Sequence, residues 1–144
     1  MASHVSSPPK LFTITEANAS LPLVRAITRD LVQASRELLD RRERVQQLMS
    51  GRRLASGNLY DEELAQIEEQ LDQDAHRVQE YIDELQELGV EPRSAIDGLV
   101  DFPARLHDRM VYLCWKLGEE RVQYWHEIDR GFSSRKPLPS HKDA

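Results

Sequence analysis

The chain has 144 residues, 31% of them charged, and a formal net charge of -6. This length suits one domain with a modest core, and the acidic balance argues against a general attraction for nucleic acid. No apolar run approaches the roughly 20 residues that cross a bilayer, and the N-terminal segment lacks the features of a signal peptide. The one cysteine permits no internal disulfide. We therefore expect a cytoplasmic protein with no membrane partner.

Both ends of the chain are expected to be disordered. Residues 1–10 are polar and include two prolines, and residues 133–144 have a similar composition. This leaves a single domain over residues 11–132.

The first helix is expected over about residues 15–49, with Thr15 as its N-cap. Pro22 lies too deep for the first turn, so it should kink the helix or split off a short opening turn. Beyond it, apolar residues recur every seven positions at Val24, Leu31, Leu38 and Val45. This narrow stripe fits one partner helix. It stops at residues 50–57, a flexible basic connector.

The second helix is expected over about residues 58–88. Its apolar residues again recur every seven positions, at Leu64, Leu71, Val78 and Leu85. Gly89 should end it as a left-handed cap, with Val90 packing back on Leu85. Matched phases predict a long antiparallel hairpin. Because a two-helix hairpin has little core, we expect a homodimer or another homo-oligomer.

From Leu99 the pattern alternates and β-formers dominate, which predicts a small three-stranded antiparallel sheet within about residues 99–127. The strands are placed at about 99–105, 110–117 and 120–127. The fold class is therefore α+β, mainly α. A first turn at His107-Asp108 and a second at Gly118-Glu119 define the register. The resulting pairs are Asp101 with Cys114, Pro103 with Tyr112, Cys114 with Gln123, and Tyr112 with Trp125.

This register assigns every strand residue to one of two faces, because successive side chains alternate. The apolar face, which includes Trp115 and His126, should pack on the helices. The opposite face mixes charge, aromatic surface and a thiol, which is typical of a binding surface. The candidate binding residues are Asp101, Arg105, Tyr112, Cys114, Arg121, Gln123 and Trp125.

Two signatures resemble a bacterial family that is known only as a domain of unknown function. The first is Phe12-Thr13-x-x-Glu16-Ala17-Asn18. The second combines Gly98-Leu-Val-Asp-Phe-Pro-Ala-Arg105, Val111-Tyr-Leu-Cys-Trp115, Gly118-Glu119 and Tyr124-Trp125-His126. The resemblance spans about residues 11–138 and implies no activity. It leads us to expect Asp-Gly at the first turn, where this chain has His107-Asp108.

Cys114 is the obvious candidate for a nucleophile or a metal ligand, although a packing role is the more common use of a free cysteine. A Cys–His–Asp catalytic arrangement is disfavoured, because the expected register puts His126 on the opposite face from Cys114 and Asp101. No zinc-binding spacing such as C-x-x-C or H-E-x-x-H is present. We predict no cofactor, with zinc or iron on Asp101, Cys114 and His126 as the alternative.

The expected function is a non-enzymatic interaction or assembly module. It would bind a protein partner, or a second copy, through the C-terminal sheet. The alternative is a small metal-binding protein or enzyme that uses Asp101, Cys114 and His126. A nucleic-acid role would rest on Arg52 and Arg53 in the connector, and the acidic second helix makes it the weakest of the three hypotheses.

Overall fold

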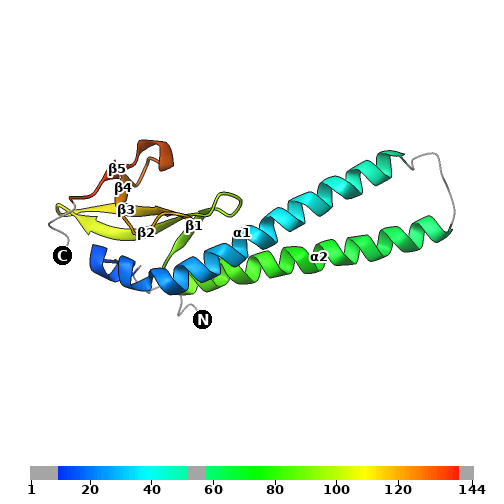
Figure 1. The fold of residues 1–144 in the computed structure, drawn as a ribbon, viewed down its shortest axis with the longest axis horizontal. Coiled ribbons are helices and arrows are strands. Elements are labelled where there is room, and N and C mark those ends of the chain that lie inside the picture. Colours follow the sequence, from blue (N-terminus) through cyan, green and yellow to red (C-terminus); the bar gives the residue numbers. More distant parts are fainter. Residues whose placement is uncertain (1–9, 52–57, 140–144) are drawn as a thin grey trace, which may run out of the picture.

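The computed structural model describes residues 10–51 and 58–139, and two long helices dominate it (Figure 1). Helix α1 spans Ile14–Gly51 and helix α2 spans Asn58–Glu87. They form the predicted antiparallel hairpin, and an antiparallel sheet lies beside the end where α1 begins and α2 ends. The fold is α+β and mainly α, as predicted. The disorder predicted for residues 1–9 and 140–144, and most of the predicted connector, lies outside the described residues.

Helix α1 begins one residue earlier than predicted and uses a different cap. The Thr13 hydroxyl accepts a hydrogen bond from the Glu16 N–H at 3.0 Å, and the Glu16 carboxylate accepts one from the Thr13 N–H at 3.0 Å. This reciprocal capping box satisfies two amide donors that a helix start leaves without partners. Thr13, not Thr15, is therefore the N-cap. Pro22 lies within one continuous helix, so the predicted separate opening turn does not form.

Helix α2 ends in the predicted left-handed glycine cap. Gly89 has φ of +88°, and its N–H donates to the Gln86 carbonyl at 2.9 Å. The Val90 N–H donates to the Leu85 carbonyl at 3.0 Å, which completes a Schellman motif. Val90 and Leu85 are both buried. The cap thus directs the chain from the hairpin into the sheet.

The sheet has five strands in the order β1-β2-β3-β4-β5, two more than predicted. The strands are β1 (Glu91–Ser94), β2 (Leu99–Leu106), β3 (Arg109–Lys116), β4 (Tyr124–Glu127) and β5 (Lys136–Pro137). Neither edge strand was predicted from the sequence, because each is short and contains a proline. An edge strand tolerates proline, since one side of its backbone forms no ladder.

The β2–β3 hairpin has the predicted turn and register. His107 and Asp108 have φ of +53° and +64°, the left-handed conformation that a two-residue hairpin turn requires. Asp101 pairs with Cys114 and Pro103 pairs with Tyr112, as predicted.

The predicted β3–β4 register is wrong by one residue. Cys114 pairs with Tyr124, and Tyr112 pairs with His126. The predicted tight turn is instead a loop over residues 117–123, held by a helix residue. The Asn18 side chain accepts a hydrogen bond from the Val122 N–H at 2.8 Å and donates one to the Val122 carbonyl at 3.4 Å. The shift moves every β4 side chain to the opposite face from the one predicted.

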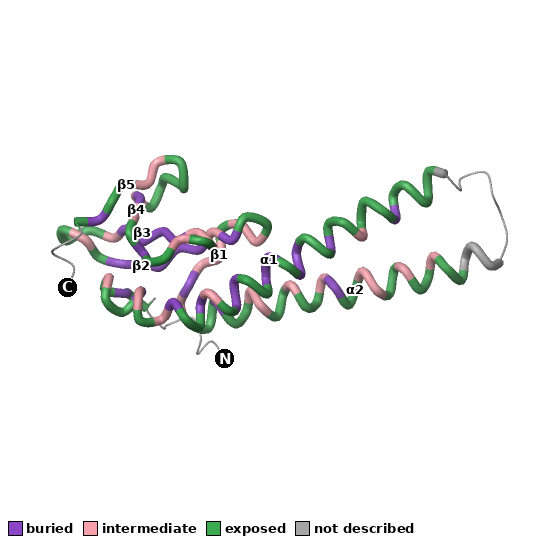
Figure 2. The backbone as a smooth tube through the Cα atoms, viewed as in Figure 1, coloured by how far each residue is buried: buried purple, intermediate pink, exposed green. Residues whose placement is uncertain are grey.

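The core lies between the sheet and the adjoining end of the hairpin, where the buried residues cluster (Figure 2). Trp115 is buried there, as predicted, and its indole N–H donates to the Glu119 carbonyl at 3.0 Å. Trp125 packs partly against the same core, so its predicted place on the opposite face is wrong. The far half of the hairpin is mostly exposed or half-buried (Figure 2). No described helix is long and apolar enough to span a membrane.

The folded part extends past residue 132, the boundary predicted from the sequence. A 3₁₀ turn at Phe132–Ser134 leads into β5. Leu138 is buried in the core, and its N–H donates to the Gln123 carbonyl at 2.8 Å. Residues 133–138 therefore belong to the domain.

Candidate metal centre

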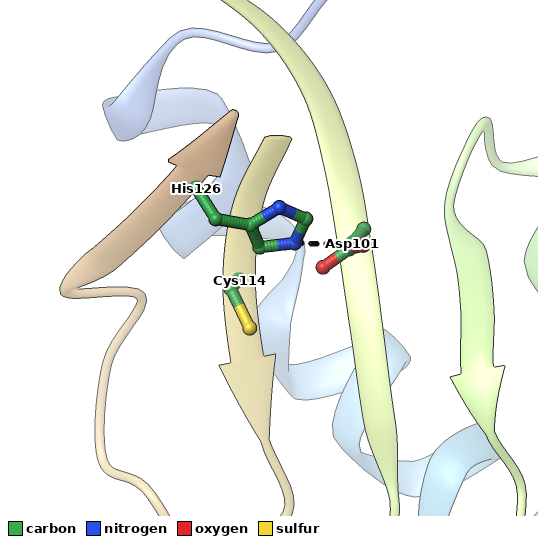
Figure 3. Close-up of side chains that lie close together, drawn as sticks. All are labelled: Asp101, Cys114 and His126. Atoms are coloured by element: carbon green, nitrogen blue, oxygen red, sulfur yellow. Dashed lines mark hydrogen bonds and ion pairs between the residues drawn. The ribbon is translucent and has the colours of Figure 1, made fainter. Parts of the chain in front are cut away.

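Three adjacent strands bring an aspartate, a cysteine and a histidine together on the sheet face that points away from the helices (Figure 3). Asp101 comes from β2, Cys114 from β3 and His126 from β4. Each is at most 2% exposed, and one ligand atom from each lies within 4.8 Å of the others. The predicted alternative trio is thus assembled, because the β4 register differs from the predicted one. Among the described residues it is the one such group of three or more.

The hydrogen bonds of His126 define its tautomer. Its Nδ1 lies 2.8 Å from the Glu127 carbonyl oxygen. A carbonyl can only accept, so Nδ1 carries the proton and donates. In the neutral ring, Nε2 then presents its lone pair to the site, 3.1 Å from Asp101 Oδ2. A metal-bound histidine has the same arrangement, with the second nitrogen donating to a carbonyl or carboxylate.

Asp101 is buried and depends on a cation for its charge. Arg93 Nε donates to Asp101 Oδ2 at 2.8 Å, and the Arg93 guanidinium lies 4.6 Å from the centre of the Tyr112 ring. A buried carboxylate without such a partner would be costly. Arg93 therefore both compensates Asp101 and fixes the direction in which its oxygens point.

Burial, followed by the nearby charge of Asp101, raises the pKa of the Cys114 thiol to about 12. Arg135 acts in the opposite sense, with Nη1 4.0 Å from the sulfur. The Arg135 guanidinium is itself held by Glu119 and stacks on Tyr124 and Phe132. Without a bound cation, Cys114 is therefore a protonated thiol at neutral pH and a poor nucleophile.

The trio lies at a cavity of about 460 Å³, within the usual range for small-molecule sites. Its rim is built mainly by the segment that follows β4, from Ile128 to Phe132. The three polar groups therefore line this cavity while each residue stays at most 2% exposed.

The geometry fits a metal centre better than a catalytic triad. With bonds of about 2.0–2.3 Å, the ligand atoms of a tetrahedral zinc site lie roughly 3.3–3.6 Å apart. Asp101 and His126 are already close to that separation, and a shift of about 1 Å brings in the sulfur. A Cys–His–Asp triad needs one imidazole nitrogen on the sulfur. The nitrogens of His126 face the Glu127 carbonyl oxygen and Asp101 Oδ2, and neither forms a hydrogen bond with the Cys114 sulfur.

The predicted binding residues separate into three groups. Asp101, Tyr112 and Cys114 line the cavity, and Arg105 lies exposed on the same face of β2, outside the cavity. Arg121 and Gln123 lie exposed in the β3–β4 loop. Trp125 lies on the helix-facing side, with Arg109 and Lys136 near its ring.

Arg93 and Arg135 contact the site but were not predicted from the sequence as parts of it. Arg93 lies in the unpredicted strand β1, and Arg135 lies in the segment predicted to be a disordered tail. Their charge was visible in the sequence, but their position depends on the two edge strands.

Fold and site together define a small α+β protein, in which a helical hairpin supports a sheet with a buried Asp–Cys–His cluster. The chain belongs to the family described as uncharacterized conserved protein (DUF2203), which matches residues 10–138. This confirms the resemblance to a domain of unknown function. No curated protein and no solved structure matches the chain.

Proposed function

We propose that this chain binds one divalent metal ion, zinc in the first place, through Asp101, Cys114 and His126. The observation that carries the proposal is the convergence of three buried ligand types from three neighbouring strands. Thiolate, imidazole and carboxylate are all zinc ligands, and the combination of sulfur with nitrogen favours zinc over magnesium or calcium.

The surroundings of each ligand support the proposal. Arg93 orients Asp101, the Glu127 carbonyl fixes the His126 tautomer, and Arg135 lies near the Cys114 sulfur. Such outer contacts orient metal ligands and raise affinity. A divalent cation would also offset the negative charges of the carboxylate and the thiolate.

Three protein ligands beside a cavity correspond to the catalytic type of zinc site, in which one coordination position is left for water or substrate. A zinc ion bound there would supply a Lewis acid and lower the pKa of a coordinated water. The residues of the chain would hold the ion and present its open position to the cavity. The proposed class is thus a metal-dependent enzyme or small-molecule binder.

Cobalt titration of the full chain tests this proposal. Co²⁺ added to chelator-treated protein should give a thiolate-to-cobalt charge-transfer band that saturates at one ion per chain. Cys114→Ser should abolish the band. His126→Gln should weaken Co²⁺ binding by roughly 100-fold or more, because losing a ligand should cost more than losing an outer contact of a ligand. His76→Gln is the matched control, because His76 is exposed on α2 and pairs with Glu80. Absence of the band, or equal loss in His76→Gln, would contradict the proposal.

We further propose that the far half of the hairpin associates with a second copy. Leu39, Leu48 and Met49 are 40–46% exposed there. A concave strip of about 320 Å³ between the helices includes Val45, Leu48 and Ile67. In this half, α1 contains Arg41, Arg42 and Arg44, whereas α2 contains Glu68, Glu69 and Asp72. An antiparallel second hairpin would cover the apolar strip and bring opposite charges together.

Light scattering with size-exclusion chromatography tests this association. The full chain should be a dimer at tens of micromolar, and Leu48→Glu should make it a monomer. Leu23→Glu, at an exposed residue of α1 beside the sheet, should remain dimeric. A monomeric wild-type chain would contradict the association without affecting the metal proposal. Binding of a different protein through the sheet, as expected from the sequence, stays a prediction.

A further inference from the structure

We infer that the open position of the metal centre takes the carboxylate of a small organic acid with an apolar chain. This inference rests on the proposed metal site and names the class of ligand for it. Two features of the cavity carry it: the charge left when a metal is bound, and the apolar side chains at the rim.

The charges around the cavity favour a singly charged anion. A divalent ion balances the carboxylate of Asp101 and a thiolate at Cys114, and Asp129 balances Arg130 among the cavity residues. The guanidinium of Arg93 then remains as one uncompensated positive charge. The field of a bound metal and one guanidinium favours an anionic over a neutral fourth ligand. A single uncompensated positive charge matches a monoanion better than a dianion such as phosphate.

Arg130 is the residue best placed to contact the ligand without serving the metal. It is exposed, lines the cavity and makes no ion pair with another described residue. Arg93, by comparison, is already engaged by Asp101 and Tyr112. Arg130 can therefore attract the ligand carboxylate electrostatically while serving no metal ligand.

The remaining cavity wall is apolar. Leu99, Ile128 and Phe132 line it, and Ile128 and Phe132 are 52% and 37% exposed. Large apolar side chains that remain exposed beside a cavity with polar groups are typical of a ligand site. They can contact the hydrocarbon part of an acid whose carboxylate reaches the metal.

The test uses the cobalt-loaded full chain and a series of acetate, butanoate and hexanoate. Each acid should shift the cobalt visible spectrum. The affinity should rise at least twofold for each added methylene, compared with about fourfold for a methylene that is completely buried. Hexanamide, the neutral analogue, should bind at least tenfold more weakly than hexanoate. Equal affinities across the series, or hexanamide as tight as hexanoate, would overturn the inference. Tighter binding of inorganic phosphate than of hexanoate would also overturn it.

Two arginine variants complete the test. Arg130→Gln should weaken hexanoate binding about threefold to fivefold, as expected for an exposed ion pair, while leaving cobalt affinity unchanged. Arg105→Gln, on the same sheet face but outside the cavity, should change neither. Equal hexanoate affinity in Arg130→Gln and wild type would overturn the inference. If the wild-type chain does not bind cobalt, the metal proposal is overturned as well. If it binds cobalt but fails the hexanoate tests, only the ligand inference is overturned.

Discussion

Asp101 Oδ2 and His126 Nε2 lie 3.1 Å apart although their strands are not neighbours. Asp101 lies on β2 and His126 on β4, and β3 with Cys114 lies between them. The contact therefore depends on the registers of two strand pairs at once. A register shift of one residue in β4 would turn the His126 side chain toward the helices, away from Asp101 and Cys114.

The contact between Arg93 and Asp101 should matter for metal affinity. Arg93→Gln removes the cation that compensates and orients the buried Asp101 carboxylate. We expect zinc affinity to fall about 10- to 100-fold, the usual effect of losing an outer contact of a ligand. Competition titration with a chromophoric chelator measures this. Arg105→Gln removes the same charge from the same face and should leave zinc affinity unchanged.

The thiol of Cys114 should react slowly in the metal-free folded chain. Its pKa is raised from 9.0 to about 12, so the thiolate fraction below pH 9 is lower than in the unfolded chain by roughly 1,000-fold. The iodoacetamide rate at pH 8 should therefore be far lower in native than in denatured protein. It should rise about tenfold per pH unit while the chain stays folded. Equal rates in buffer and in denaturant would contradict the burial of Cys114.

The same shift predicts how stability depends on pH. The folded chain holds the Cys114 proton more tightly than the unfolded chain, so folding binds protons once pH exceeds 9. The contribution of this group to stability is complete below the unfolded pKa of about 9 and is lost progressively from there toward pH 12. Denaturant melts of metal-free protein at pH 8 and pH 10 should show lower stability at pH 10. Cys114→Ala should reduce the difference.

Asn18 should be required for the β4 register. Its side chain forms two hydrogen bonds with the backbone of Val122 and connects α1 to the loop that precedes β4. Asn18→Ala should lower the free energy of unfolding by about 1–3 kcal/mol, because Val122 loses its partner in a partly buried loop. Urea melts followed by circular dichroism measure the change. Gln33→Ala, which removes only an exposed bond to Glu37, should cost less than about 0.5 kcal/mol.

The two tryptophans should differ in their contribution to stability. Trp115 is fully buried, so Trp115→Ala should cost about 3–5 kcal/mol. Trp125 is half-buried against the core, so Trp125→Ala should cost less, about 1–2 kcal/mol, and should leave metal stoichiometry unchanged. Thermal melts and metal analysis of both variants check this. Loss of metal from a folded Trp125→Ala variant would contradict the face assignment of β4.

The elements that could be predicted from sequence are those with local signals. Heptad spacing defined both helices, and Gly89 marked the end of the second. Alternation with a two-residue turn defined the β2–β3 hairpin and the pairing of Asp101 with Cys114. Each of these depends on residues that are close in the chain.

The remaining features depend on contacts that a local pattern does not contain. Strand β1 contains Pro92, and β5 has only two residues, so neither gives a strand signal. The loop before β4 is held by Asn18, which is 104 positions from Val122 in the chain. The β4 register decides whether His126 joins Cys114. The candidate ligands were therefore named from the sequence, but their convergence could not be predicted from it.

X-ray absorption at the zinc edge, on the full chain loaded with one zinc ion, identifies the ligand atoms of the proposed metal centre. We expect one sulfur ligand at about 2.3 Å and nitrogen or oxygen ligands at about 2.0–2.2 Å, including one imidazole. Cys114→Ser should remove the sulfur contribution, and His76→Gln should leave the spectrum unchanged. A wild-type spectrum with only nitrogen and oxygen ligands would contradict the assignment of Asp101, Cys114 and His126 as a metal centre.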